Sequence, residues 1–197
     1  MRSILRAAVL LIAATLPCSA QVTTWQTDPA HSAAQFMVRH MMISNVRGEF
    51  HNITGTLQFD EKDITKSSIE VTIDATTVDT REERRNTHLK SADFLDVANF
   101  PTMTFKSKSV ARAGEGRLKV TGDLTIRGVT KEVVLDVDGP TPALKMGNST
   151  RRGVSATTKI NRKDFGVSWS RALDGGGMVV SDEVNITLDV EFLLKSQ

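Results

Sequence analysis

Apolar and polar residues alternate along much of this 197-residue chain, and the alternation is clearest between residues 117 and 138. In the first half of that stretch the apolar positions share one face of an extended chain, as in a β-strand with one buried face. These positions are Leu118, Val120, Leu124 and Ile126. After Gly128 the pattern resumes with Val133, Leu135 and Val137. The stretch therefore predicts two antiparallel strands joined by a short turn.

The same period recurs in six other stretches, so the sequence predicts an all-β protein with eight strands. The six stretches are residues 33–40, 46–60, 68–76, 102–110, 153–162 and 184–194. Within the second of them the apolar phase slips by one residue near His51 and Asn52. Such a slip is typical of a β-bulge, which bends a long strand as a barrel requires.

One short helical excursion is expected between strands three and four, within residues 77–101. Thr80 followed three residues later by Glu83 is a capping-box pattern, and the residues after it favour helix. This helix is polar nearly all round, so we expect it to stand in solvent. The residues that follow carry an apolar patch that needs something to cover: Leu89, Phe94, Leu95, Val97 and Phe100.

Eight antiparallel strands in sequence order favour a closed up-and-down barrel, because closure removes both exposed sheet edges. The inward faces are almost free of charge and mix large residues with small ones such as Gly48, Gly122 and Ala156. Small inward residues are expected to leave volume that an apolar ligand fills. The alternative is a tapered barrel with a solidly packed core.

Residues 1–20 read as a secretory signal peptide cut after Ala20. Arg2 and Arg6 precede an apolar run that is too short to span a bilayer, and small residues follow it. The residues before Cys18 fit a lipoprotein signal poorly. Cleavage would leave residues 21–197 as one domain without cysteine and with 23 basic against 23 acidic residues. That balance argues against nucleic acid as a partner, and the segment predicts a periplasmic or secreted protein without stable membrane insertion.

Several fragments together resemble the YceI-like family, also called the polyisoprenoid-binding or lipid-binding YceI domain. They are WQTDPAHSAAQFMVRH with VRGEF, DFLDVANFPTMTF, GDLTIRGVTKEV and KINRKDFGV, and the resemblance runs over essentially the whole mature chain, from Trp25 to the last strand. The resemblance implies a lipocalin-like β-barrel, export in bacteria, and a lumen for a long isoprenoid or similar amphiphile. The positions that match the family's motifs are Asp28, His31, Phe36, His40, Gly48, Phe50, Phe94, Phe100, Pro101, Phe105, Gly122, Gly128, Arg162, Phe165 and Gly166.

The candidate ligand-binding residues combine the inward positions with the aromatic residues of the two long connections. Those expected in the lumen are Phe36, Val38, His40, Phe50, Ile73, Met103, Phe105, Leu124 and Ile126, and those expected from the connections are Phe94, Phe100, Phe165 and Trp169. His40 points into an apolar lumen, where it either has a protein partner or helps to hold a ligand's head group. Gly175–Gly177, in the second long connection, are interpreted as a hairpin tip.

The main hypothesis is a carrier or storage protein for an isoprenoid-type lipid, such as a quinone or its precursor, with no cofactor and no catalytic group. Its partner is then a hydrophobic small molecule, and a homodimer remains open. The alternative is an enzyme acting on such a lipid with His40 as acid or base; a structural stress protein without a ligand is a third. His31, His40 and His51 lack metal-site spacing, so no metal is predicted.

Overall fold

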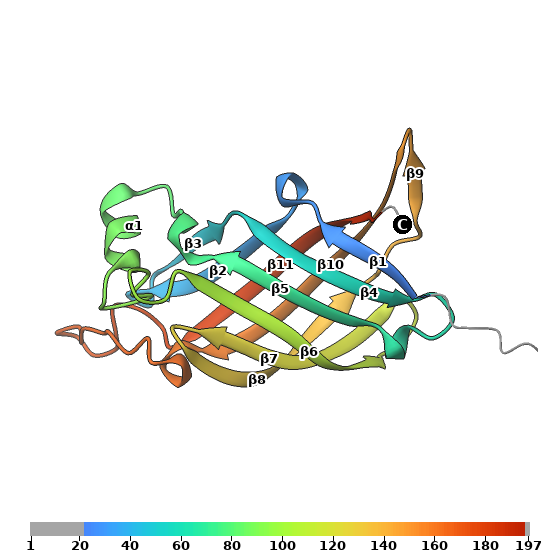
Figure 1. The fold of residues 1–197 in the computed structure, drawn as a ribbon. Coiled ribbons are helices and arrows are strands. Elements are labelled where there is room, and N and C mark those ends of the chain that lie inside the picture. Colours follow the sequence, from blue (N-terminus) through green and yellow to red (C-terminus); the bar gives the residue numbers. More distant parts are fainter. Residues whose placement is uncertain (1–21, 196–197) are drawn as a thin grey trace, which may run out of the picture.

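The computed structural model describes residues 22–195, and the strands in this range form one closed antiparallel barrel (Figure 1). The eleven strands follow the order β3-β2-β11-β1-β4-β5-β6-β7-β8-β10-β9, and an additional pairing of β10 with β11 closes the ring. The strands are β1 (Val22–Thr27), β2 (Ala33–His40), β3 (Ser44–Phe50), β4 (Ile53–Asp60), β5 (Ser68–Asp74), β6 (Thr102–Arg112), β7 (Arg117–Ile126), β8 (Val129–Asp138), β9 (Leu144–Met146), β10 (Ser149–Asn161) and β11 (Glu183–Leu194). The helices are α1 (Glu83–Lys90) and the 3-10 turns η1 (Pro29–His31), η2 (Ile64–Lys66), η3 (Ala75–Thr77) and η4 (Arg162–Phe165).

The ring has eight strand positions because two of them are each built from two short strands, and because β9, which pairs only with β10, lies outside the ring. β1 and β2 both pair with β11, and η1 interrupts them. β3 and β4 follow one another with Asn52 between them at a φ of +56°. Phe50 and Ile53 both line the interior, so the predicted one-residue slip is confirmed. The eight-stranded barrel with one helical excursion is therefore confirmed.

The strand β1 was missed by the sequence analysis, which began the first strand at Ala33. Its sequence, VTTWQT, offers one large apolar side chain among threonines, so the alternation is too weak to predict a strand. In the structure Trp25 pairs with Leu57 on one side and with Leu194 on the other. Tertiary pairing thus supplies the strand that the local pattern does not indicate.

The inward-facing glycines do not leave the free volume that the sequence analysis expected from them. A Cβ atom at Gly48 would lie 2.4 Å from Phe36 Cζ, and one at Gly122 would lie 2.5 Å from Phe105 Cζ. Phenyl rings from neighbouring strands therefore cover both glycines. Their role is to admit those rings, and the interior volume has another origin.

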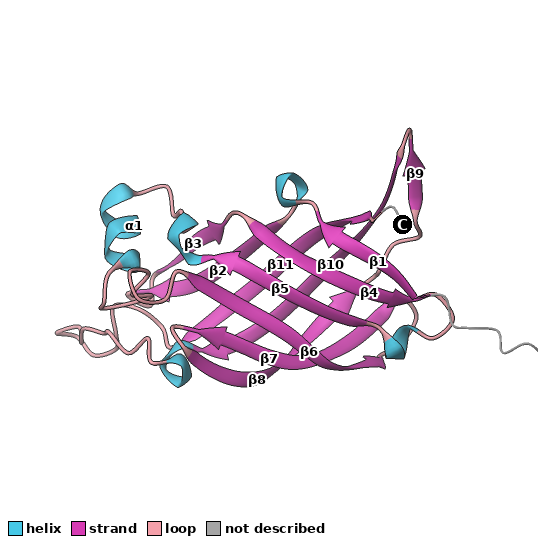
Figure 2. Cartoon of the chain, viewed as in Figure 1, coloured by secondary structure: helices cyan, strands magenta, loops and turns pink. Residues whose placement is uncertain are grey.

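Helix α1 lies at one end of the barrel, and strands form the wall of the barrel (Figure 2). The predicted capping box is wrong, because Glu82 is the N-cap and its carboxylate accepts from the N–H groups of Arg84 and Arg85. The Thr80 hydroxyl instead donates to Asn86 Oδ1 at 2.6 Å. Asn86 is buried, so the expectation that the helix stands free in solvent is also wrong.

Candidate ligand-binding cavity

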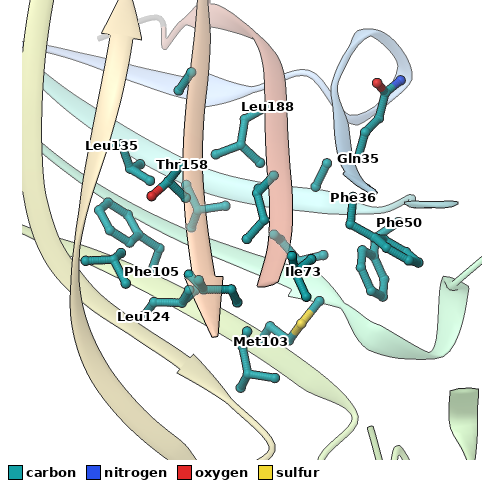
Figure 3. A pocket seen from close by; sticks show the side chains of 18 of the residues that line it. Gln35, Phe36, Phe50, Ile73, Met103, Phe105, Leu124, Leu135, Thr158 and Leu188 are labelled. Atoms are coloured by element: carbon teal, nitrogen blue, oxygen red, sulfur yellow. The ribbon is translucent and has the colours of Figure 1, made fainter. Parts of the chain in front are cut away.

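A cavity of about 430 Å³ runs inside the barrel, and its lining is overwhelmingly apolar. Figure 3 shows side chains from several strands pointing into this space, among them Phe50, Ile73, Phe105 and Leu188. A volume of this size falls within the usual range of about 300–1,000 Å³ for small-molecule sites.

Partial exposure of inward aliphatic side chains distinguishes this cavity from a packed core. Ile73, Leu124 and Leu188 face the interior, line the cavity and remain only partly buried. In a solid core such side chains would be fully buried against one another. The alternative of a solidly packed barrel is therefore wrong.

One end of the barrel, which we call the plugged end, is filled by large rings. Trp25 and Phe192 are 1% and 0% exposed and pack with Leu57 and Phe59. The guanidinium of Arg152 lies 4.3 Å from the centroid of the Trp25 ring and 3.9 Å from that of Phe59. Cations attract aromatic faces in this way.

Arg152 is buried at the plugged end with few polar partners. Its Nη2 donates to Glu61 Oε1 at 3.3 Å, while its Nε has no hydrogen-bond partner among the described residues. Burial lowers the pKa of this guanidinium, and the Glu61 charge opposes that shift. The side chain remains charged because arginine does not lose its proton in proteins.

The opposite end, which we call the helical end, is bordered by α1 and residues 166–182. Here His88, Phe94 and Trp169 pack together, with ring centroids 5.0 Å apart for His88 and Phe94 and 5.1 Å for His88 and Trp169. His88 Nε2 also lies 2.9 Å from Asp93 Oδ2, which orients the ring. The cavity-lining residues His40, Val180 and Trp169 are partly exposed at this end, so we take it as the mouth.

Arg162 fixes the segment 166–182 to the barrel. Its Nε donates to the carbonyl of Ser181 at 2.9 Å, and its Nη1 donates to the carbonyls of Val167 and Trp169, each at 2.7 Å. Its Nη2 donates to Asp182 Oδ1 at 3.0 Å. Burial lowers the pKa of Arg162, and Asp182 opposes the shift. One side chain thus ties together three points of an otherwise irregular segment.

Several polar residues of the lining were not among the predicted site residues: Gln35, Ser67, Ser68, Arg85, His88 and Thr158. Arg85 and His88 are the two that come from α1. They lie three residues apart and therefore share one face of α1. They were not predicted because the whole helix was expected to lie in solvent. Arg85 is held in place by Thr80, with Nε 2.8 Å from the hydroxyl and Nη2 2.8 Å from the carbonyl. The available signal in the sequence was the i, i+3 spacing of Arg85 and His88, with the apolar Leu89 directly after them.

The structure brings all but one of the predicted site residues to the cavity. Phe36, Val38, His40, Phe50, Ile73, Phe94, Met103, Phe105, Leu124, Ile126, Phe165 and Trp169 line it. Phe100 does not, because its ring covers Gly128, 2.6 Å from where a Cβ would stand. The His40 ring has no hydrogen-bond partner within residues 22–195, so the alternative of a histidine satisfied by the protein finds no support there. Contact of these residues with a ligand stays a prediction.

Two groups of side chains among the described residues have the spacing of a metal site. They are Asp28, His31 and Glu191, and Glu49, His51 and Asp79. In the first group Arg151 already donates to Asp28 and Glu191, so a guanidinium occupies the place of a cation. His40 belongs to neither group. The Gly175–Gly177 segment forms the expected hairpin tip, where the Gly176 N–H donates to the Leu173 carbonyl.

Among the helices of residues 22–195, none combines the length and the apolar character needed to cross a bilayer.

Comparison with known proteins places the whole barrel in one family. The chain matches the YceI-like domain over residues 25–192. A UPF0312 protein of Vibrio parahaemolyticus is 36% identical over 85% of this chain and 89% of its own, and UPF0312 proteins of Staphylococcus aureus are 34% identical over 87% and 98%.

Solved structures give the same result. BcnA of Burkholderia cenocepacia superposes with a TM-score of 0.71 at 26% identity, over 84% of this chain and 98% of its own. The YceI protein of Campylobacter jejuni gives 0.68 at 31% identity, over 80% and 90%. A polyisoprenoid binding domain from Saccharophagus degradans gives 0.64 at 16% identity, over 89% and 100%, which shows a shared fold. The chain belongs to the YceI-like family.

Proposed function

We propose that this protein is an exported carrier or storage protein that holds a long-chain isoprenoid, or a similar amphiphilic lipid, in the barrel lumen. The observation that carries the proposal is the partial exposure of inward aliphatic side chains such as Leu124 and Leu188 around an apolar cavity of about 430 Å³. A binding role needs no catalytic group, and family membership favours binding over catalysis.

Burial of hydrocarbon supplies the driving force. Each methylene transferred from water to an apolar site contributes about 0.8 kcal/mol. A few prenyl units therefore offset the loss of translational freedom and the ordering of the chain, which together cost several kcal/mol. The elongated shape of the cavity, which is lined from Phe192 at the plugged end to Trp169 at the helical end, suits a chain better than a compact ligand.

The ionisable side chains of the lining lie where a head group would be held. His40, Arg85 and His88 all line the cavity, and His88 belongs to the helical end. We therefore propose that the hydrocarbon extends toward the plugged end while the head group stays at the mouth. The Saccharophagus degradans domain is named for the same ligand class, but at 16% identity it supports the fold alone.

Export is part of the proposal and rests on the sequence of residues 1–20, which lie outside the described residues. The charged start, the apolar run and the small residues before Gln21 fit a cleaved signal peptide. A periplasmic or secreted location would place the carrier where lipids must cross water between membranes.

Mass spectrometry of organic extracts tests the binding role. Protein purified from its native host without detergent should release an isoprenoid-type lipid. Ala156→Leu, which adds volume to a lining position paired with Leu188, should lower the bound lipid at least several-fold. Thr157→Leu places a leucine on the outward face of the same strand and should leave the lipid unchanged. Extracts without lipid from the wild-type protein and from both variants would overturn the proposal.

The enzyme alternative keeps one supporting observation, the His40 ring, which faces the cavity and has no hydrogen-bond partner within residues 22–195. If His40 acts as an acid or base, His40→Gln should abolish conversion of the bound lipid and leave its uptake intact. Identical extracts from the wild type and His40→Gln, with the same lipid in the same chemical state, would favour binding alone.

A further inference from the structure

The turn between β2 and β3 carries apolar side chains into solvent. Met42 is 64% exposed and Ile43 is 74% exposed, and Met41 is exposed as well. The Ile43 N–H donates to the His40 carbonyl at 2.9 Å and closes the turn. Met41 and Met42 have φ values of +51° and +61°. Positive φ values are adopted readily by glycine, asparagine and aspartate and rarely by other residues.

Folding alone does not account for methionines at these two positions. The hairpin between β7 and β8 also has two successive positive φ values, +50° at Arg127 and +73° at Gly128, and there a charged residue and a glycine occupy the turn. A left-handed backbone conformation is disfavoured for a residue with a large side chain. An apolar side chain that is exposed to solvent also contributes no hydrophobic stabilisation to the fold. The Met41–Ile43 turn therefore presents apolar surface that something outside the chain is expected to cover.

This turn borders the mouth of the cavity. The Met41 N–H donates to the carbonyl of Val179 at 2.8 Å, and Val179 lines the cavity. Met42 lies against the hairpin tip, with its Cγ 3.4 Å from the place of a Cβ at Gly177. In Figure 1 the end of β2 reaches the same end of the barrel as α1. An object that covers the turn would thus also face the mouth.

The charge around the turn is positive. The sequence from Pro29 to Gly48 contains no aspartate or glutamate, but it holds Arg39 and Arg47, both exposed. The neighbouring segment 166–182 adds Arg171 and Asp174, which offset one another, and Asp182, which is paired with Arg162 and Lys163. An exposed apolar tip flanked by arginines matches the interface of an anionic bilayer, where the tip enters the acyl boundary and the cations meet phosphates.

We propose that the Met41–Ile43 turn inserts into the interface of an anionic phospholipid bilayer and directs the mouth toward that bilayer, so that lipid passes between membrane and lumen. The inference rests on the proposed lipid-carrying function and adds the surface from which the lipid is taken. Three side chains are too few for a stable protein partner, whose interface needs about 800 Å² on each side. They suffice for reversible membrane contact.

Vesicle flotation with phosphatidylglycerol-rich vesicles, compared with phosphatidylcholine vesicles, measures the docking. The variant Met41→Asn/Met42→Gly installs the pair that the turn geometry favours, so the fold is retained. We expect its vesicle-bound fraction to fall about tenfold or more, because interfacial binding scales with inserted apolar area. Leu144→Ser/Met146→Ser is the matched control, since these residues are equally exposed on the β9 turn and lie outside the lining; its binding should match the wild type.

Two further measurements separate this inference from the proposed function. Uptake of a fluorescent prenyl lipid added from ethanol tests the lumen alone and should be equal in both double variants and the wild type. Transfer of the same lipid out of vesicles tests docking and should slow only in Met41→Asn/Met42→Gly. Normal vesicle binding by that variant, loss of binding in the control, or a wild-type dimer that the variant dissolves would each overturn the docking proposal. Failure of ethanol uptake in every protein would instead overturn lipid binding.

Discussion

The two ends of the barrel bury one arginine each and satisfy it in different ways. At the plugged end Arg152 lies between the rings of Trp25 and Phe59, with one carboxylate contact and an unpaired Nε. At the helical end Arg162 donates to three backbone carbonyls and to Asp182. The first arginine fills space, whereas the second holds irregular backbone.

This difference indicates which end can open. The contacts of the plugged end join side chains on paired strands, such as Trp25 on β1 and Leu57 on β4. The helical end is closed by residues 166–182, a segment without long strands that is held mainly by hydrogen bonds from Arg162, from Arg127 to the Gly166 carbonyl, and from the Met41 N–H to the Val179 carbonyl. Local opening uses segments with few packed contacts, so ligand exchange is expected at the helical end, and the two ends should respond differently to substitution.

The largest effect is expected from truncation of the ring that fills the plugged end. Trp25→Ala should lower the free energy of unfolding by about 3–5 kcal/mol, because a fully buried aromatic is lost and a cavity remains. Trp169→Ala, at the partly exposed helical end, should cost clearly less and should speed the release of bound lipid. Chemical denaturation and lipid-release kinetics measure the two effects. Equal destabilisation by both variants would contradict the comparison.

Next in size is the loss of the arginine that holds the helical end. Arg162→Met leaves the carbonyls of Ser181, Val167 and Trp169 without their donor, and should cost about 3 kcal/mol. Arg162→Lys retains the charge but cannot reproduce the fork, so an intermediate loss is expected. Urea unfolding gives the free energies, and amide hydrogen exchange of residues 166–182 should rise in both variants. Unchanged hydrogen exchange in this segment would show that Arg162 does not hold the mouth closed.

A smaller effect is expected from the ion network around Asp28. The hydrogen bond from His31 is the main cause that lowers the pKa of Asp28 below its ordinary value of 3.8, with help from the Ala30 N–H and Arg151. The folded protein therefore binds this proton less readily than the unfolded chain, so the stabilisation is complete above pH 3.8 and is lost as the pH falls below it. Asp28→Asn should cost about 1–2 kcal/mol at neutral pH, and the difference from the wild type should shrink in acid. Thermal unfolding between neutral pH and pH 3 checks this, and a constant difference would contradict it.

The smallest effect is expected at Arg152. In Arg152→Met the methionine side chain takes the place of the aliphatic part of the arginine and keeps its contacts with Trp25 and Phe59. The substitution also removes a buried charge that lacks a full set of hydrogen-bond partners. Arg152→Met should therefore change the free energy of unfolding by less than about 1 kcal/mol, in either direction. Set beside Arg162→Met in the same urea series, it isolates the value of the backbone contacts. A loss of stability as large as that of Arg162→Met would show that Arg152 stabilises the fold as much as Arg162 does, and would contradict the comparison.

The sequence predicted most of the barrel because alternation is a local property. Two-residue periodicity assigned the inward residues of the long strands, including Ile73, Phe105 and Leu188, and the phase slip located the bulge at Asn52. The strand β1 was not predicted because its alternation is weak. The N-cap of α1 was predicted wrongly because the Thr80–Glu83 spacing matches a capping box by chance. Where a local pattern was strong, it agreed with the structure.

The candidate site was predictable only in part, for a physical reason. Strand periodicity determined by itself which side chains face an apolar interior, and the structure then showed that this interior holds a cavity and is not solidly packed. Only the tertiary structure decided that phenyl rings cover Gly48 and Gly122, that Arg85 and His88 reach the lining, and that one end is plugged. Those outcomes depend on contacts between residues far apart in the chain, and no local period records which rings and cations meet when a sheet closes on itself.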